Sequence, residues 1–295
     1  MNPNRKRLAI TQAVVLLAAA CAATNVDLPA ITEAPTGERH NGRIVWHDLL
    51  TNDPAASRRF YGGLFGWEFE NAGSRADSVY TLIRHNGRLI GGMVDTVALN
   101  GKDDISQWVA LMSVDDIDAT VARFESEGGT VLTPPTDLRR RGRLAVVTDA
   151  QGALLGLLQA RDGDPADREP DIGGFLWDEL WASDVAQATE FYEDVAGLEA
   201  RDRDVDGDGR TGAEYRTLHA GGRPRAGILP MPLEGLDPVW VSYIRVEDPA
   251  AITERVRELG GRVIVDAQDR PLGGRVAFVA GPSGAGIALQ TWPPE

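Results

Sequence analysis

The stretch WHDLLTND (Trp46–Asp53) recurs as WDELWASD (Trp177–Asp184), shifted by 131 positions. The same shift carries Phe60, Tyr61 and Gly66 onto Phe191, Tyr192 and Gly197, and a shift of 132 carries Trp108, Gly128, Gly129, Arg143, Ala145 and Val147 onto Trp240, Gly260, Gly261, Arg275, Ala277 and Val279. Gln159 returns as Gln290 with the first shift. A spacing that stays nearly constant over most of the chain indicates two copies of one domain.

The composition is that of a soluble globular protein. A chain of 295 residues, of which 43% are hydrophobic and 25% charged, is long enough for two domains with their own cores. The formal net charge of -14 argues against nucleic acid as a partner, because phosphate binding needs clustered lysine and arginine. Cys21 is the only cysteine, so neither a disulfide within the chain nor a cysteine-based zinc site is possible.

Residues 1–20 have the pattern of a secretory signal peptide, in which basic residues precede an apolar stretch. That stretch, at 8–20, is shorter than the ~20 apolar residues that cross a bilayer as a helix. It ends at Cys21 and resembles the lipobox of bacterial lipoproteins, in which the cysteine is lipidated. We therefore expect secretion across the inner membrane and a lipid anchor at Cys21, in the periplasm or at the cell surface, with 21–40 as a tether. Ordinary cleavage among the alanines is the alternative.

Each copy shows the order strand, helix, strand, strand, strand, and shows it twice. In the first copy a strand at 43–50 precedes Asp53 as the expected N-cap, Pro54 as the first helical residue and Gly66 as the stop signal. Apolar residues at helical spacing lie between them, and three strands with turn residues follow. We place the first domain at 41–160, a linker rich in Asp, Gly and Pro at 161–172, and the second domain at 173–293.

This order resembles the vicinal oxygen chelate superfamily, which includes glyoxalase I, extradiol dioxygenases and bleomycin-resistance proteins. The resemblance rests on Trp46, Asp53, Phe60, Tyr61, Gly66 and Trp67 at their spacings and on the turn at Asp149–Gly152 before the last strand. It implies an α+β fold of tandem glyoxalase-like domains, each built of two βαβββ modules with a curled mixed sheet. Such motifs are specific for the fold and weak for the activity.

In metal-dependent members of that family, side chains in the hollow of the curled sheet hold one ion. The resemblance places one ligand seven residues before the helix-starting Asp, where this chain has Trp46 and Trp177, and another on the last strand, where it has Gln159 and Gln290. Because successive strand residues face opposite sides, we expect His47 to point away from the hollow. We therefore expect no resident metal. A divalent metal held by His47 is the alternative, since a shift of one residue along the strand would bring it inside.

The hollow of each sheet is the candidate site for a small-molecule ligand. The expected lining residues are Trp46, Asp48, Trp108 and Gln159 in the first domain and Trp177, Glu179, Trp240 and Gln290 in the second. An apolar hollow with a few polar groups is typical of a ligand site, and Asp48 and Glu179 are candidate general bases. The alternative is that the tryptophans only fill the core and the two acids are bonded to the backbone.

Two charged segments are further candidate sites. Asp204, Asp206 and Asp208 match the start of a calcium loop, but its twelfth position is Tyr215, so a weak calcium site competes with a solvated acidic hairpin. The arginines within 139–143 favour a solvated loop, with an anion clamp over the first hollow as the alternative.

The residues thus predict a protein that binds a small molecule in one or both hollows without a catalytic metal. The first alternative is an enzyme of the superfamily, either a metal-dependent lyase, isomerase or dioxygenase that uses His47 or an acid–base enzyme that uses Asp48 or Glu179. The second is an envelope scaffold with filled hollows. We expect the two domains to pair with each other or the chain to form a homodimer.

Overall fold

The computed structural model describes residues 28–72, 79–100, 106–202, 215–270 and 273–291. Cys21 and the acidic segment Asp204–Asp208 lie outside these residues. In the part of the chain that is described, no helix is long and apolar enough to cross a membrane.

Residues of the first domain form one eight-stranded mixed sheet. Its strands are β1 (Ile44–Thr51), β2 (Glu68–Asn71), β3 (Tyr80–His85), β4 (Arg88–Asp95), β5 (Gln107–Ser113), β6 (Thr130–Asp137), β7 (Gly142–Thr148) and β8 (Leu154–Ala160), and its helices are α2 (Pro54–Phe65), α3 (Thr96–Asn100) and α4 (Ile117–Ser126). The order across the sheet is β2-β3-β4-β1-β5-β8-β7-β6, so the first strands of the two modules, β1 and β5, lie side by side and antiparallel.

The second domain repeats this arrangement. Its strands are β9 (Phe175–Ala182), β10 (Glu199–Asp202), β11 (Arg216–Ala220), β12 (Arg223–Pro230), β13 (Val239–Arg245), β14 (Arg262–Asp269), β15 (Arg275–Ala280) and β16 (Gly286–Gln290), and its helices are α5 (Val185–Ala196) and α6 (Pro249–Glu258). The order is β10-β11-β12-β9-β13-β16-β15-β14, which matches the first sheet strand for strand. The expected α+β fold of two tandem domains is confirmed.

The helix boundaries follow from the capping residues. The Asp53 side chain accepts a hydrogen bond from the backbone N–H of Ala56, Pro54 is the first helical residue, and Gly66 ends α2 with a left-handed φ of 70°. Asp184 and Gly197 delimit α5 in the same way. The repeated Asp and Gly of the sequence are therefore the two ends of equivalent helices.

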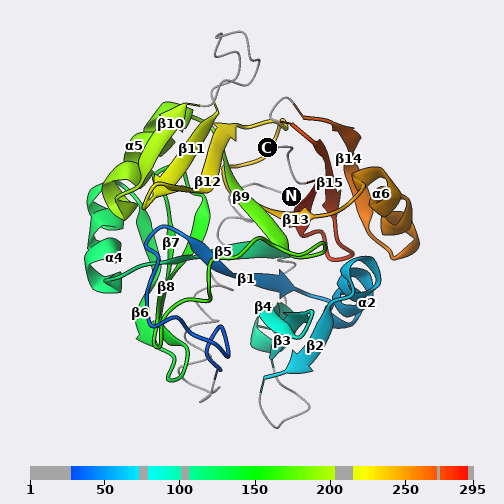
Figure 1. The fold of residues 1–295 in the computed structure, drawn as a ribbon, viewed down its shortest axis with the longest axis horizontal. Coiled ribbons are helices and arrows are strands. Elements are labelled where there is room, and N and C mark those ends of the chain that lie inside the picture. The colour runs from blue at the N-terminus through cyan, green and yellow to red at the C-terminus, as the bar shows by residue number, and fades with distance from the viewer. Residues whose placement is uncertain (1–27, 73–78, 101–105, 203–214, 271–272, 292–295) are drawn as a thin grey trace.

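The helix-bearing faces of the two sheets pack against each other. Figure 1 shows α4 beside α5 at one side of the molecule and α2 beside α6 at the other, and residues of these pairs are in contact. At the first contact the rings of Phe124 and Phe191 meet edge to face with centroids 5.1 Å apart, inside a core that both domains share. The opposite face of each sheet therefore points away from the other domain.

The segment before β1 is packed rather than loose. Leu28 and Ile31 are each 2% exposed and lie in the core on the face of the first sheet opposite α2 and α4, together with Trp46 and Leu144. Complete burial of such a side chain contributes about 1.5–3 kcal/mol. The expectation of a tether at 21–40 is therefore wrong for Leu28–Ile31. Their apolar side chains pack against the first sheet, although the segment has neither helical nor strand periodicity.

Candidate functional site

We call the face of the first sheet opposite α2 and α4, which carries Trp46, the first cup, and the corresponding face of the second sheet, which carries Trp177, the second cup. In the first cup the carboxylate of Asp48 accepts hydrogen bonds from Trp46 Nε1 at 2.9 Å and from the Tyr80 hydroxyl at 2.6 Å. Arg141 donates to the same hydroxyl at 2.8 Å, and its guanidinium lies 4.6 Å from the centre of the Trp46 ring. Asp48 is 3% exposed, so these donors replace water.

The second cup contains the same kind of network around Glu179, which is fully buried. One carboxylate oxygen accepts from the Tyr215 hydroxyl at 2.7 Å and from Arg270, and the other accepts from the Tyr243 hydroxyl. Arg270 also donates to the side-chain oxygen of Gln290. Glu179, Arg270 and Gln290 are thus joined by hydrogen bonds. We call this network the polar floor of the second cup.

Two glycines make this arrangement possible. A Cβ on Gly92 would lie 1.9 Å from the Tyr80 hydroxyl, and a Cβ on Gly227 would lie 2.2 Å from the Tyr215 hydroxyl. Gly92 pairs with Asp48 across β4 and β1, and Gly227 pairs with Glu179 across β12 and β9. In each cup the tyrosine hydroxyl lies over the glycine and so reaches the carboxylate, because glycine has no side chain in the way.

The protonation of the second cup follows from burial and from its charges. Burial raises the pKa of Tyr215 and Tyr243 above the ordinary range, and the charge of Glu179 raises it further. Burial by itself lowers the pKa of Arg270, but the attraction of Glu179 and of the two tyrosines outweighs it, so the pKa lies above its usual value. The two hydroxyls therefore stay donors and Arg270 stays charged at neutral pH.

The two cups differ in how much of their apolar lining meets solvent. Three positions of the first cup are at most 4% exposed, whereas their counterparts in the second cup are half-buried. The pairs are Trp46 and Trp177, Leu144 and Val276, and Val146 and Phe278. In the first cup, Leu28 and Ile31 lie in the same buried cluster as these residues, together with Leu138 and, partly buried, Leu99 of α3. The second cup keeps an accessible aromatic surface above its polar floor.

Two of the expected lining tryptophans lie elsewhere. Trp108 donates to the Tyr61 hydroxyl at 3.0 Å, and Trp240 donates to the Tyr192 hydroxyl at 2.9 Å, in the cores between the sheets and the helices. Val109, the neighbour of Trp108, faces the first cup instead. The placement of both tryptophans in the cups was wrong by one residue, and in a strand one residue changes the face.

Gln159 also lies outside the first cup. It donates to the backbone oxygen of Asp115 at 2.9 Å, and its neighbour Leu158 is the residue that packs in the cup. Strand pairing gives Leu158 the position in β8 that Gln290 has in β16, which is a shift of 132 rather than 131. Of the expected residues, the structure therefore brings Trp46 with Asp48 and, separately, Trp177, Glu179 and Gln290 together.

His47 points away from the first cup, as the spacing before Asp53 predicts, and the structure places it against the other domain. Its Nε2 lies 3.0 Å from the Asp178 carboxylate, its ring stacks on Phe175 with centroids 3.6 Å apart, and Ser242 donates to Asp178 at 2.7 Å. The pair is buried and joins equivalent positions of the two repeats. The side chain of His47 therefore lies outside the first cup, whereas the alternative of a metal held by His47 places it inside.

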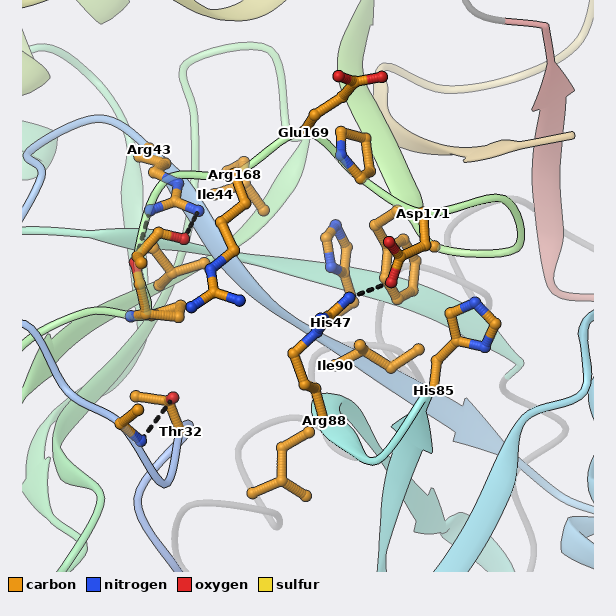
Figure 2. A pocket seen from close by; sticks show the side chains of 18 of the residues that line it. Thr32, Arg43, Ile44, His47, His85, Arg88, Ile90, Arg168, Glu169 and Asp171 are labelled. Atoms are coloured by element: carbon orange, nitrogen blue, oxygen red, sulfur yellow. Dashed lines mark hydrogen bonds and ion pairs between the residues drawn. The ribbon is translucent and has the colours of Figure 1, made fainter.

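A cavity of about 280 Å³ lies beside His47, between β1, β4, the segment before β1 and the interdomain linker. Figure 2 shows His47 and His85 on its walls and Arg88 reaching Asp171. Glu169, also at its edge, is paired with Arg245 at 2.7 Å. Much of the charge that lines this cavity is thus paired within the protein. The lining of the second cup, in contrast, is apolar.

The residues present do not fit the divalent metal that the fold family implies. Within the described ranges, no three His, Cys, Asp or Glu side chains lie close enough together to hold an ion. The first-strand positions hold Trp46 and Trp177, and the last-strand positions hold Leu158 and Gln290. Neither indole nor an aliphatic chain is a metal ligand, and a single neutral amide is a poor one.

The structure adds residues to the cups that the sequence reading missed. Tyr80 and Tyr215 are equivalent, but they are separated by a shift of 135 because the preceding loops differ in length. Gly92 and Gly227 recur with the same shift of 135, and this recurrence could have revealed that the two tyrosines pair with the acids. Arg141 is 2% exposed, so the solvated loop expected at 139–143 is wrong at this residue.

Comparison with known proteins gives one consistent family. Residues 43–157 and 174–289 match the family described as Glyoxalase/Bleomycin resistance protein/Dioxygenase superfamily. The chain is 33% identical over 251 residues to "Putative glyoxylase CFP32" of Mycobacterium tuberculosis, a match that covers 84% of this chain and 94% of that protein. It is 31% identical over 260 residues to "Anthracycline biosynthesis protein DnrV" of Streptomyces peucetius, covering 84% and 92%.

Solved structures share the fold at low identity. The Mn(II)-bound glyoxalase from Novosphingobium aromaticivorans aligns with a TM-score of 0.59 at 16% identity, covering 87% of this chain and 84% of that one. A catechol 2,3-dioxygenase aligns with a TM-score of 0.56 at 15% identity, covering 86% and 89%. These likenesses concern the arrangement of strands and helices.

The ion pair of the second cup predicts the effect of Arg270→Met. Met keeps most of the volume but leaves Glu179 buried without its cation, which typically costs about 3–5 kcal/mol. Arg275→Met is the matched control, because Arg275 is 43% exposed and its pair with Asp248 is worth at most about 1 kcal/mol. Urea denaturation measures both free energies of unfolding. Equal stability of the two variants would contradict the assigned network.

Proposed function

The chain belongs to the glyoxalase/bleomycin resistance protein/dioxygenase superfamily, and from that premise we propose that it binds a flat, largely aromatic small molecule in the second cup without a resident metal ion. The rings of the ligand lie against Trp177 and Phe278, and a polar group of the ligand meets Arg270 and Gln290. The observation that carries this proposal is the half-buried apolar lining of the second cup beside the buried lining of the first.

The chemistry of the second cup suits such a ligand. Aromatic rings stack with about 0.5–1.5 kcal/mol beyond the area they bury, and a few fixed polar groups then orient the molecule. Glu179 already accepts from Tyr215, Tyr243 and Arg270. We therefore assign Glu179 to holding Arg270 in position rather than to proton transfer.

The relative from Streptomyces peucetius suggests the first probe, since its name refers to anthracycline biosynthesis. An anthracycline is a flat molecule of several fused rings with hydroxyl and carbonyl groups along its edge. It offers both the stacking surface and the polar groups that the second cup is proposed to recognise. Its own fluorescence also reports binding directly.

Fluorescence titration of an anthracycline with the full chain tests the proposal. Trp177→Ala should weaken binding at least tenfold, which corresponds to about 1.4 kcal/mol, because it removes the stacking surface. Val97→Ala, at a 46% exposed position of α3 in the first domain, is the control and should bind like the unaltered protein. The proposal fails if the unaltered protein does not bind the probe or if Trp177→Ala binds it equally well.

Removal of metal provides an independent test of the donor set. Because indole and aliphatic side chains occupy the positions of the expected ligands, prolonged chelation should leave the melting temperature and the anthracycline affinity unchanged. Differential scanning calorimetry before and after chelation measures the first quantity. A large loss of stability that zinc, nickel, manganese or iron reverses would contradict the metal-free site, whereas reversal by calcium alone would point to Asp204–Asp208.

We further propose that Cys21 is lipidated and holds the protein at a bacterial membrane outside the cytoplasm. The support is the sequence alone, in which an apolar stretch ends at the single cysteine. An extended chain spans at most ~3.5 Å per residue, so Leu28 would lie within ~25 Å of the anchor. Cys21→Ser should move the protein from the membrane fraction to the soluble fraction of cells. Unchanged membrane association in this variant would refute the anchor.

A further inference from the structure

We propose that the first cup is a second binding site of the same ligand chemistry, and that Leu28–Ile31 of the same chain occupy it. The class of ligand rests on the function proposed for the second cup. The occupancy by Leu28–Ile31 rests on separate observations, namely the contacts that these residues make.

The first cup shares the acid, the tyrosine and the arginine of the polar floor of the second. In each cup a tyrosine hydroxyl donates to an acid of the first strand, Asp48 or Glu179. In each an arginine from the loop before the seventh or fifteenth strand lies over that tyrosine ring, Arg141 at 5.2 Å and Arg270 at 5.8 Å from the ring centre. The duplicated chain therefore contains the indole, the tyrosine, the acid and the arginine twice, whereas Leu158 and Val146 of the first cup replace Gln290 and Phe278 of the second.

Leu28–Ile31 make the two kinds of contact in the first cup that a ligand would make. Leu28 and Ile31 place apolar side chains against the apolar lining of the first cup, and each is 2% exposed. The backbone oxygen of Pro29 accepts a hydrogen bond from Arg141 Nε at 3.1 Å. An apolar group over the sheet and an acceptor at the arginine are the two features that we assign to the ligand of the second cup.

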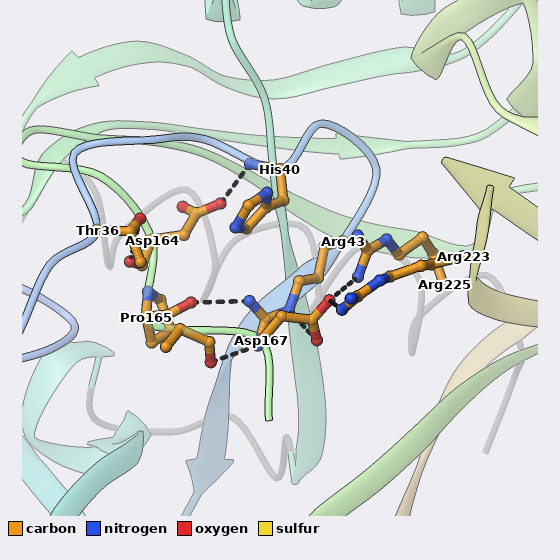
Figure 3. A network of polar contacts seen from close by, with 9 residues as sticks. Thr36, His40, Arg43, Asp164, Pro165, Asp167, Arg223 and Arg225 are labelled. Carbon is orange, nitrogen blue, oxygen red and sulfur yellow. Dashed lines mark hydrogen bonds and ion pairs between the residues drawn. The ribbon is translucent and has the colours of Figure 1, made fainter. Parts of the chain in front are cut away.

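The segment is attached in a way that permits release. Leu28–Ile31 belong to no strand of either sheet, so their departure breaks no strand pairing. The chain just after them is fastened to the linker, because the backbone N–H of Thr36 donates to the Asp164 backbone oxygen at 3.0 Å and that of His40 to its side chain at 2.7 Å. Figure 3 shows this network, which also joins Arg43 to the linker. Residues 33–38, between the cup and His40, are exposed.

It follows that the full chain binds one ligand, in the second cup, and that release of Leu28–Ile31 uncovers a second site. Ile31→Asp should release the segment, because a charged side chain cannot stay in the apolar cup. Ala34→Asp adds the same charge three residues later at an exposed position and is the matched control.

Calorimetric titration of the full chain with the anthracycline measures the number of sites. We expect one site per chain for the unaltered protein and for Ala34→Asp, and two for Ile31→Asp. Adding the synthetic peptide LPAITEA, which corresponds to Leu28–Ala34, should return Ile31→Asp to one site. Combining Ile31→Asp with Trp177→Ala should leave the site of the first cup and weaken the other at least tenfold. A single site in folded Ile31→Asp would overturn the inference.

Two further measurements apply if Ile31→Asp does not fold or if the anthracycline does not bind. If Ile31→Asp does not fold, Ile31→Ala with Leu28→Ala weakens the same contacts without a buried charge, and two sites are again expected. If no protein binds the anthracycline, the proposed function fails, but a fluorescent LPAITEA peptide still tests the occupancy. It should bind the released variant at least tenfold more tightly than the unaltered chain, and equal binding would contradict an occupied cup.

Discussion

The hydrogen bond from a tyrosine to a buried acid is the interaction on which each cup depends. An ionised carboxylate in an apolar hollow is stable only when donors replace the water that it has lost. Tyr80 and Tyr215 supply that donor across Gly92 and Gly227. A side chain on either glycine would displace the hydroxyl, so the glycine, the tyrosine and the acid act as one unit. That unit fixes the polar floor against which an arginine is held.

The same unit lies beside the positions at which the fold family implies metal ligands. The position that faces the hollow on the first strand carries Trp46 or Trp177, and the acid lies two residues further on. An indole next to a carboxylate paired with tyrosine favours stacking and directed hydrogen bonds. It does not favour several charged ligands converging on one ion. The flat ligand that we propose would contact the half-buried lining of the second cup.

Much of the fold could be predicted from the repeats, because they record the residues that end helices and alternate along strands. Asp53 and Gly66 bound α2, and the count from Asp53 to Trp46 predicts that His47 points away from the hollow, as it does. The count failed at Gln159, where the shift changes from 131 to 132, since a single residue reverses the face of a strand. The alternation of faces along a strand therefore predicted His47 correctly and Gln159 wrongly.

The rest could not be predicted because it depends on segments without periodicity. Arg141 comes from a loop rich in arginine, whose composition is that of a solvated turn, yet it folds over Tyr80. Leu28 and Ile31 lie in a stretch with no strand or helix pattern, and their burial becomes visible only once the first cup exists to receive them. Long-range packing of loops, rather than local propensity, decides which cup is open.

A crystal structure of the full chain grown with an anthracycline tests the central claim most directly. The account predicts ligand density in the second cup against Trp177 and near Arg270, with Leu28 and Ile31 still in the first cup. Density confined to the cavity beside His47, or a metal ion coordinated in the second cup, would contradict it.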